Sequence, residues 1–145
     1  MEEEFEFGFT EDPKFSVERY EEMIRNHDQY FFDAQAFENI IDYYIEKNDP
    51  AKALQVAEYA RNQHPFAAVF LIKQAQLLVV GNKVPEAFAA LEKAAMLEAS
   101  DADIYIIRGN LYESMERYSE ALENYEKALG LAEETDEILL HIAYV

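Results

Sequence analysis

The chain has 145 residues, of which 50% are hydrophobic and 14% aromatic, and its formal net charge is −18. This apolar content is too high for an intrinsically disordered chain and is sufficient for one elongated folded domain. The negative charge disfavours nucleic acid and anionic membranes as partners, because binding to either depends on cationic side chains that neutralise phosphate. We therefore expect a protein or peptide partner that is basic or neutral, no nucleic acid and no membrane.

The sequence also bears on location and on thiol chemistry. Its first residues lack the basic and apolar regions of a signal peptide, and no apolar run approaches the ~20 residues that span a bilayer. A cytoplasmic location is the default expectation. Cysteine is absent, which excludes disulfides and thiolate ligands to a metal.

Residues 1–12 form an acidic segment in which carboxylates alternate with Phe5, Phe7 and Phe9. One interpretation is a poorly ordered acidic tail. The other is that the phenylalanines pack on the first helices or serve as a docking peptide. Both interpretations stay open from the sequence.

Four aspartates are predicted to start helices as N-caps, because a short carboxylate can accept hydrogen bonds from the first free backbone amides. Two of them are followed by a proline, which is favoured in the first helical turn. They are Asp12, Asp33, Asp49 and Asp101. The first predicted helix and its connector cover residues 13–33, and this helix is interpreted as a lone second helix or an N-terminal cap.

From Ala34 onward, one arrangement of large and small residues recurs at a constant interval, without insertion or deletion. In its clearest copy, Tyr105, Gly109 and Tyr112 share a face of one helix, and a second helix carries an equivalent face. That second face consists of Ala121, Tyr125 and Ala128. The register predicts repeat 1 at residues 34–67, repeat 2 at 68–101, repeat 3 at 102–135 and a truncated first helix of repeat 4 at 136–145.

This unit resembles the tetratricopeptide repeat family, which has the same repeat length. In that family the first helix carries a large, a small and an aromatic residue, and the second carries alanine, a bulky residue and alanine. The resemblance is most specific in residues 102–135, whereas Ile41 departs from it at a position that is small in the family. It implies an all-α fold, a right-handed superhelical array of antiparallel helix pairs. This α-solenoid would contain about eight helices and no strand.

The resemblance also implies a concave groove for ligands, lined by residues that follow the core positions of each first helix. In this sequence the predicted lining residues are Glu38, Asp42, Ile45, Ile72, Gln76, Val79, Ile106, Asn110, Glu113, Leu140 and Tyr144. Ile72, Val79 and Ile106 are expected either to be exposed in the groove or to contact a neighbouring first helix. The carboxylates at the N-terminal end make an acidic C-terminal tail a poor ligand.

The sequence offers no motif for catalysis. His27, His64 and His141 lie far apart without ligand spacing for a metal, and there is no glycine-rich phosphate loop and no nucleophile motif. We therefore expect no enzyme activity, no metal and no cofactor. The predicted function is a protein–protein interaction module that binds an apolar and basic peptide or helix; the alternatives are a self-associating assembly unit and the delivery part of a larger protein.

The final predicted helix, residues 136–145, is too short to persist alone in water. We expect it to dock on the preceding helix through Leu139, Ile142 and Ala143. Residues left without a partner would be Leu140, Tyr144 and Val145. This end would then either fray or pack against another copy, as a homodimer or as an extended array.

Overall fold

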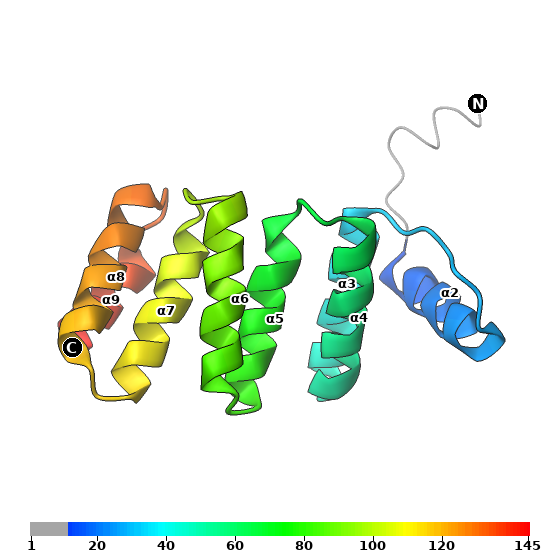
Figure 1. Ribbon diagram of the computed structural model, residues 1–145, viewed down its shortest axis with the longest axis horizontal. Coiled ribbons are helices and arrows are strands. Elements are labelled where there is room, and N and C mark those ends of the chain that lie inside the picture. The colour runs from blue at the N-terminus through cyan, green and yellow to red at the C-terminus, as the bar shows by residue number, and fades with distance from the viewer. Residues whose placement is uncertain (1–11) are drawn as a thin grey trace. The chain divides into compact units, whose positions relative to one another are not determined.

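The structure is a computed structural model that describes residues 12–145, shown in Figure 1. The described part contains eight helices and no strand, so the predicted all-α fold is confirmed. The helices are α2 (Pro13–Asn26), α3 (Ala34–Glu46), α4 (Pro50–Gln63), α5 (Ala68–Val80), α6 (Val84–Leu97), α7 (Ala102–Ser114), α8 (Tyr118–Leu131) and α9 (Asp136–Tyr144). The two interpretations of Phe5, Phe7 and Phe9 lie outside the described residues.

The four aspartates predicted as N-caps all cap a helix. Each side chain accepts a hydrogen bond from a backbone amide in the first turn, which satisfies a donor that has no partner within the helix. The donors are the amides of Lys14 for Asp12 (2.9 Å), Ala36 for Asp33 (2.7 Å), Lys52 for Asp49 (3.2 Å) and Asp103 for Asp101 (3.0 Å). Local side-chain chemistry therefore fixes where these helices begin.

The turns inside the three helix pairs share one backbone geometry. Asn48, Asn82 and Glu116 occupy equivalent positions of successive repeats and adopt left-handed φ angles of 58°, 59° and 60°. In each turn the following amide donates to a carbonyl five residues earlier, as from Asp49 to Tyr44 at 2.8 Å. Asparagine tolerates this conformation better than glutamate does, so Glu116 is the strained member of the set.

The described part of the chain divides into two compact units, residues 12–64 and 65–145. The first unit contains α2, α3 and α4, with α2 packed on α3 and α3 packed on α4. Its core contains aliphatic residues and four buried aromatic side chains, Tyr20, Phe32, Phe37 and Tyr44. The connector before α3 is held by Gln63, which accepts from the Phe32 amide at 3.0 Å and donates to the Tyr30 carbonyl at 2.7 Å.

The second unit contains the antiparallel pairs α5–α6 and α7–α8, followed by α9. The first helices α5 and α7 also pack against each other. The face predicted for each second helix is fully buried: Ala87, Leu91 and Ala94 in α6, and Ala121, Tyr125 and Ala128 in α8. The small residues allow the paired helices to approach closely, which is why they recur at this spacing.

Helix α9 docks through a different face from the one predicted. Ile138 is buried, and Ile142 and Val145 pack against the core, whereas Leu139 is 48% exposed and Ala143 is exposed. The prediction for Leu139, Ala143 and Val145 was therefore wrong. Ile138 is the counterpart, one repeat later, of the buried Ile104, so α9 uses the side that packs on the preceding pair.

Candidate functional site

A cleft of about 380 Å³ lies on the second unit, across its first helices. It is lined by Gln76 and Val79 from α5, Asp103, Ile106, Ile107 and Asn110 from α7, and Glu137 from α9. Isoleucine and valine form its apolar surface, and two amides and two carboxylates provide its polar groups. A concave surface with an apolar centre and a few polar groups is the usual form of a ligand site.

Part of the predicted groove lies in this cleft. Gln76, Val79, Ile106 and Asn110 line it, and Val79 and Ile106 remain partly accessible while packing against the core. Ile72 does not line it. Of the two alternatives for Ile72, exposure in the groove is wrong, because this side chain is only 5% exposed and belongs to the hydrophobic core.

The remaining predicted groove residues lie elsewhere. Leu140 is 61% exposed and Tyr144 is 84% exposed on α9, and neither lines the cleft. Glu38, Asp42 and Ile45 belong to α3 in the first unit, where Asp42 and Ile45 are exposed. A role for these residues in ligand binding stays a prediction.

Two carboxylates of the cleft, Asp103 and Glu137, were missed from the sequence. They occupy the same position in successive repeats, so the repeat register contains a signal that pairs them. The predicted stripe started from the core positions and followed only their next neighbours. Asp103 lies one turn before Ile106 on the same helical face and was therefore left out.

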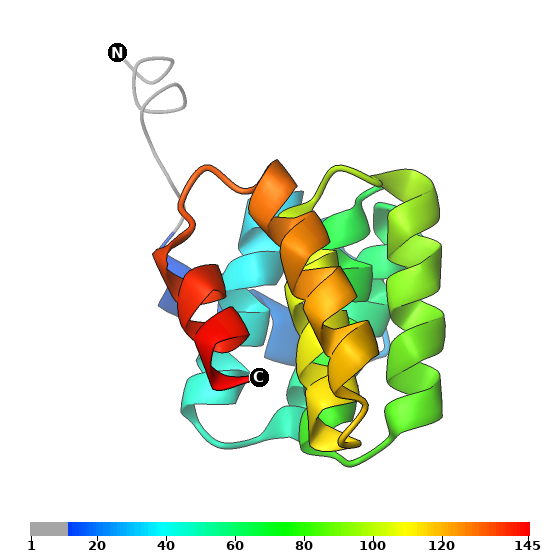
Figure 2. The ribbon, with the colours of Figure 1, turned by 90° about the vertical axis from the view of Figure 1, so that its left-hand side faces the viewer.

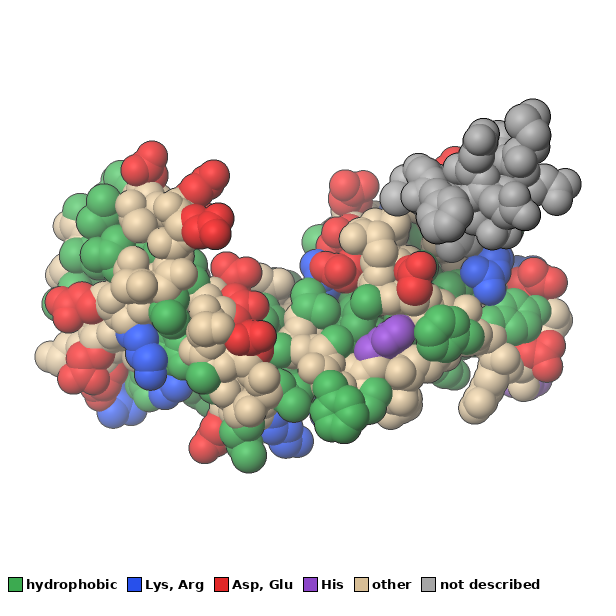
Figure 3. Space-filling view, turned by 90° about the horizontal axis from the view of Figure 1, so that it is seen from above, with side chains coloured by type: hydrophobic (Ala, Val, Ile, Leu, Met, Phe, Trp, Pro, Cys, Tyr) green, Lys and Arg blue, Asp and Glu red, His purple; other side chains and the backbone are tan. Residues whose placement is uncertain are grey.

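The surroundings of the cleft perturb one of its carboxyl groups. Reduced hydration raises the pKa of Asp103, and the negative charges of Asp101 and Glu137 raise it further, while Lys73 opposes the shift. These causes show that the ionised Asp103 carboxylate is disfavoured by its surroundings. Figure 3 shows acidic side chains gathered over the C-terminal helices, at the left of that view. A basic group in the cleft would relieve this repulsion.

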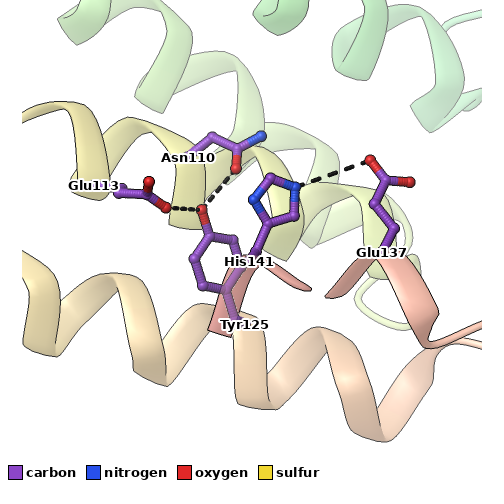
Figure 4. A network of polar contacts seen from close by, with 5 residues as sticks. All are labelled: Asn110, Glu113, Tyr125, Glu137 and His141. Atoms are coloured by element: carbon purple, nitrogen blue, oxygen red, sulfur yellow. Dashed lines mark hydrogen bonds and ion pairs between the residues drawn. The ribbon is translucent and has the colours of Figure 1, made fainter. Parts of the chain in front are cut away.

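The wall of the cleft is held in place by a buried tyrosine, shown in Figure 4. The hydroxyl of Tyr125 lies 2.6 Å from Asn110 Oδ1 and 2.8 Å from Glu113 Oε1, and its single hydrogen can be donated to either oxygen. Burial and the hydrogen bond to Glu113 raise the pKa of Tyr125, so the hydroxyl stays protonated. Glu113, a predicted groove residue, therefore acts here as a partner of Tyr125.

The same tyrosine connects the cleft to α9. The ring of His141 stacks on the ring of Tyr125, with centroids 5.1 Å apart and an interplanar angle of 18°. Glu137 Oε1 lies 3.9 Å from His141 Nε2, one helical turn away. The position of the Glu137 carboxylate at the cleft thus depends on the docking of α9 against α8, which Figure 4 shows from close by.

The first unit carries a smaller cavity of about 270 Å³. It is lined by Tyr20, Glu21, Ile24, Arg25, Tyr44, Lys52 and Gln55. The Glu21 carboxylate already accepts a hydrogen bond from the Tyr44 hydroxyl at 2.8 Å. The lining of this cavity also includes Arg25 and Lys52, so it is not acidic like the lining of the cleft of the second unit.

Within residues 12–145, no group of three or more histidine, aspartate or glutamate side chains is arranged to hold a metal ion. A search of the same residues for membrane spans finds no helix with the length and apolar character to cross a bilayer.

Antiparallel helix pairs in a constant repeat register, with a cleft across their first helices, define a helical-repeat protein. Residues 102–134 match the sequence model of the tetratricopeptide repeat. Residues 102–134 therefore form a tetratricopeptide repeat, and the helix pairs around them share the fold of solved tetratricopeptide repeat proteins. A search of curated protein sequences finds no match.

Solved structures of tetratricopeptide repeat proteins share the fold. The first such domain of Spaghetti (RPAP3), bound to the HSP90 peptide SRMEEVD, has a TM-score of 0.71 at 19% identity, covering 78% of this chain and 94% of that one. A thermophilic protein from Thermus thermophilus has a TM-score of 0.71 at 22% identity, covering 88% and 70%. YrrB, described as having an unusual peptide-binding site, has a TM-score of 0.73 at 17% identity, covering 92% and 66%.

Proposed function

We propose that this protein is a non-enzymatic interaction module, and that the cleft on its second unit binds a protein segment with an apolar anchor beside a basic residue. The observation that carries the proposal is the composition of the cleft, with Val79, Ile106 and Ile107 next to Asp103 and Glu137. An apolar side chain would be buried among the aliphatic residues, and a lysine or arginine would pair with the carboxylates.

The charge of the cleft also supports a ligand with positive charge. The peptide SRMEEVD, bound by the Spaghetti domain, contains three acidic residues. In the present cleft such a peptide would meet Asp103 and Glu137, where burial and the negative charges of Asp101 and Glu137 already raise the pKa of Asp103. We therefore propose a ligand of opposite charge, although the two domains share a fold.

Binding can be tested with an acetylated and amidated peptide of about ten residues that places Ile-Leu between lysines. Fluorescence anisotropy should show binding that weakens as salt rises, since exposed charges are screened. Versions with glutamate in place of lysine, or with serine in place of Ile-Leu, should bind at least about tenfold more weakly. Equal affinity for the lysine and glutamate peptides would refute the proposal.

The site can be tested with two charge-matched variants. D103N/E137Q removes both cleft carboxylates, whereas E123Q/E126Q removes two exposed carboxylates from α8. The first variant should weaken the lysine peptide about tenfold or more, and the second should have little effect. An equal loss in both would show that overall charge, and not the cleft, attracts the peptide. Melting temperatures of both variants verify that the fold is intact.

A further inference from the structure

Helix α9 presents an uncovered face that is covered in the equivalent helix α5. Leu139 and Ala143 of α9 correspond, two repeats later, to Leu71 and Ala75 of α5, and the residue types are the same. Leu71 is 4% exposed and Ala75 is fully buried, whereas Leu139 is 48% exposed and Ala143 is exposed. Figure 2, which looks onto this end of the molecule, shows α9 with no other helix in front of it.

The chain itself shows what covers this pair of residues. Helix α6 packs antiparallel on α5 with Ala87, Leu91 and Ala94, spaced by four and three residues and fully buried. Two small residues flanking one large residue let the helix approach the leucine and alanine of α5 closely. A helix with the same stripe would fit the equivalent leucine and alanine of α9.

The charge around α9 indicates which side chains the last turn of that helix should carry. Glu133, Glu134, Asp136 and Glu137 are all exposed at the start of α9. A helix that packs antiparallel on α9 brings its last turn to these carboxylates, and lysine or arginine in a last turn is also favoured by the helix dipole. A second copy of this chain carries a net charge of −18, so its approach is opposed by repulsion.

We propose that α9 is a second docking surface, which binds in antiparallel orientation an amphipathic partner helix with an alanine, large residue, alanine stripe and a basic last turn. This surface is defined by Leu139 and Ala143. It lies on a different side of α9 from the residues that dock the helix, Ile138, Ile142 and Val145. It does not depend on the proposed function of the cleft.

The probe is a synthetic peptide with the sequence of residues 82–99, carrying M96K and E98K to make its last turn basic. Both positions are exposed at the end of α6, and positions 89 and 93 are also exposed, so a hydrocarbon staple can link them to hold the helix. The control peptide carries A87K and A94K in addition, which keeps it basic but blocks the small positions of the stripe. Anisotropy measures the binding of each to the full chain.

We expect the probe to bind the wild-type chain at least about tenfold more tightly than the control peptide does. L139K/A143K should abolish this difference, whereas L140K/Y144K, which changes the same charge on a neighbouring side of α9, should retain it. D103N should also retain it, because the cleft is a separate site. All four substituted side chains on α9 are exposed, and circular dichroism verifies that the variants fold.

Three results would overturn the proposal. Equal binding of probe and control, or equal weakening by both α9 variants, would show attraction by charge alone. If light scattering shows a dimer of the free chain that L139K/A143K dissociates, the occupant of this face is a second copy and not a basic partner helix.

Discussion

The ring of Tyr125 in α8 lies against the backbone of Gly109 in α7, where a side chain has no room. A Cβ atom at position 109 would lie 2.6 Å from Tyr125 Cδ1 and 2.9 Å from Cζ, and a fully buried ring cannot easily move away. The same ring carries the hydroxyl that meets Asn110 and Glu113. Tight packing within the hairpin thus also positions residues at the cleft.

Gly109→Ala should lower the free energy of unfolding by about 1–3 kcal/mol, because an added methyl group overpacks this contact. Urea unfolding measures the change. Gly130→Ala, also in a helix, is the control: a Cβ atom there would have nothing within 4 Å, so it should raise stability by up to about 1 kcal/mol through helix propensity. If both alanines were stabilising, the contact between Tyr125 and residue 109 would be looser than described.

Glu116→Asn should stabilise the protein by roughly 0.5–1 kcal/mol, because asparagine tolerates a left-handed φ of 60° better than glutamate does. The reverse change in the preceding repeat, Asn82→Glu, should destabilise it by a similar amount. Thermal and urea unfolding of both variants measure the effect. The two substitutions must change the free energy of unfolding in opposite directions. A stabilising Asn82→Glu would contradict the shared turn geometry.

Asp103→Asn should stabilise the folded protein at neutral pH. The pKa of Asp103 is raised above the ordinary value of 3.8 in the folded state, so its ionisation costs folding free energy as the pH rises through the folded pKa. The advantage of the variant should therefore grow with rising pH and vanish in acid, where the carboxyl is protonated. Asp101→Asn is not a suitable control, because that side chain caps α7. Melting curves of Asp103→Asn and of the control Glu126→Gln, recorded from acidic to neutral pH, test the sign of this change in stability.

Moderate salt should raise the melting temperature, because the net charge of −18 makes the compact state repel itself. The Debye length is about 10 Å at 0.1 M, so most of the change should appear below a few tenths molar. Sodium chloride and potassium chloride should act alike if screening is the cause. A melting temperature that falls with added salt would indicate that attractive ion pairs dominate instead.

The fold was predictable because its signals are local. An aspartate placed before a helix start caps that helix, and alanine and glycine mark close contacts inside a hairpin, so both can be found without knowing the neighbours. The side of a first helix that meets the preceding pair was harder to identify. Shifting the core positions by one repeat carried Tyr105 to Leu139, which is 48% exposed, and missed Ile138, which is buried in the core.

The site was predicted only in part for the same reason. Whether Ile72 is exposed depends on how closely α5 and α7 pack, which the sequence of either helix does not contain. Asp103 and Glu137 come from different helices, and their approach depends on α9 docking. Their common register was available in the sequence, but the raised pKa that marks Asp103 requires the three-dimensional arrangement.

The cleft is complete only while α9 stays docked on the preceding helices. This nine-residue helix buries one side chain, Ile138, so it should open more readily than the hairpins it follows. Opening withdraws Glu137 and unstacks His141 from Tyr125. A ligand held by both Asp103 and Glu137 would therefore clamp α9, and amide hydrogen exchange should slow there more than anywhere else in the second unit when the cleft is filled.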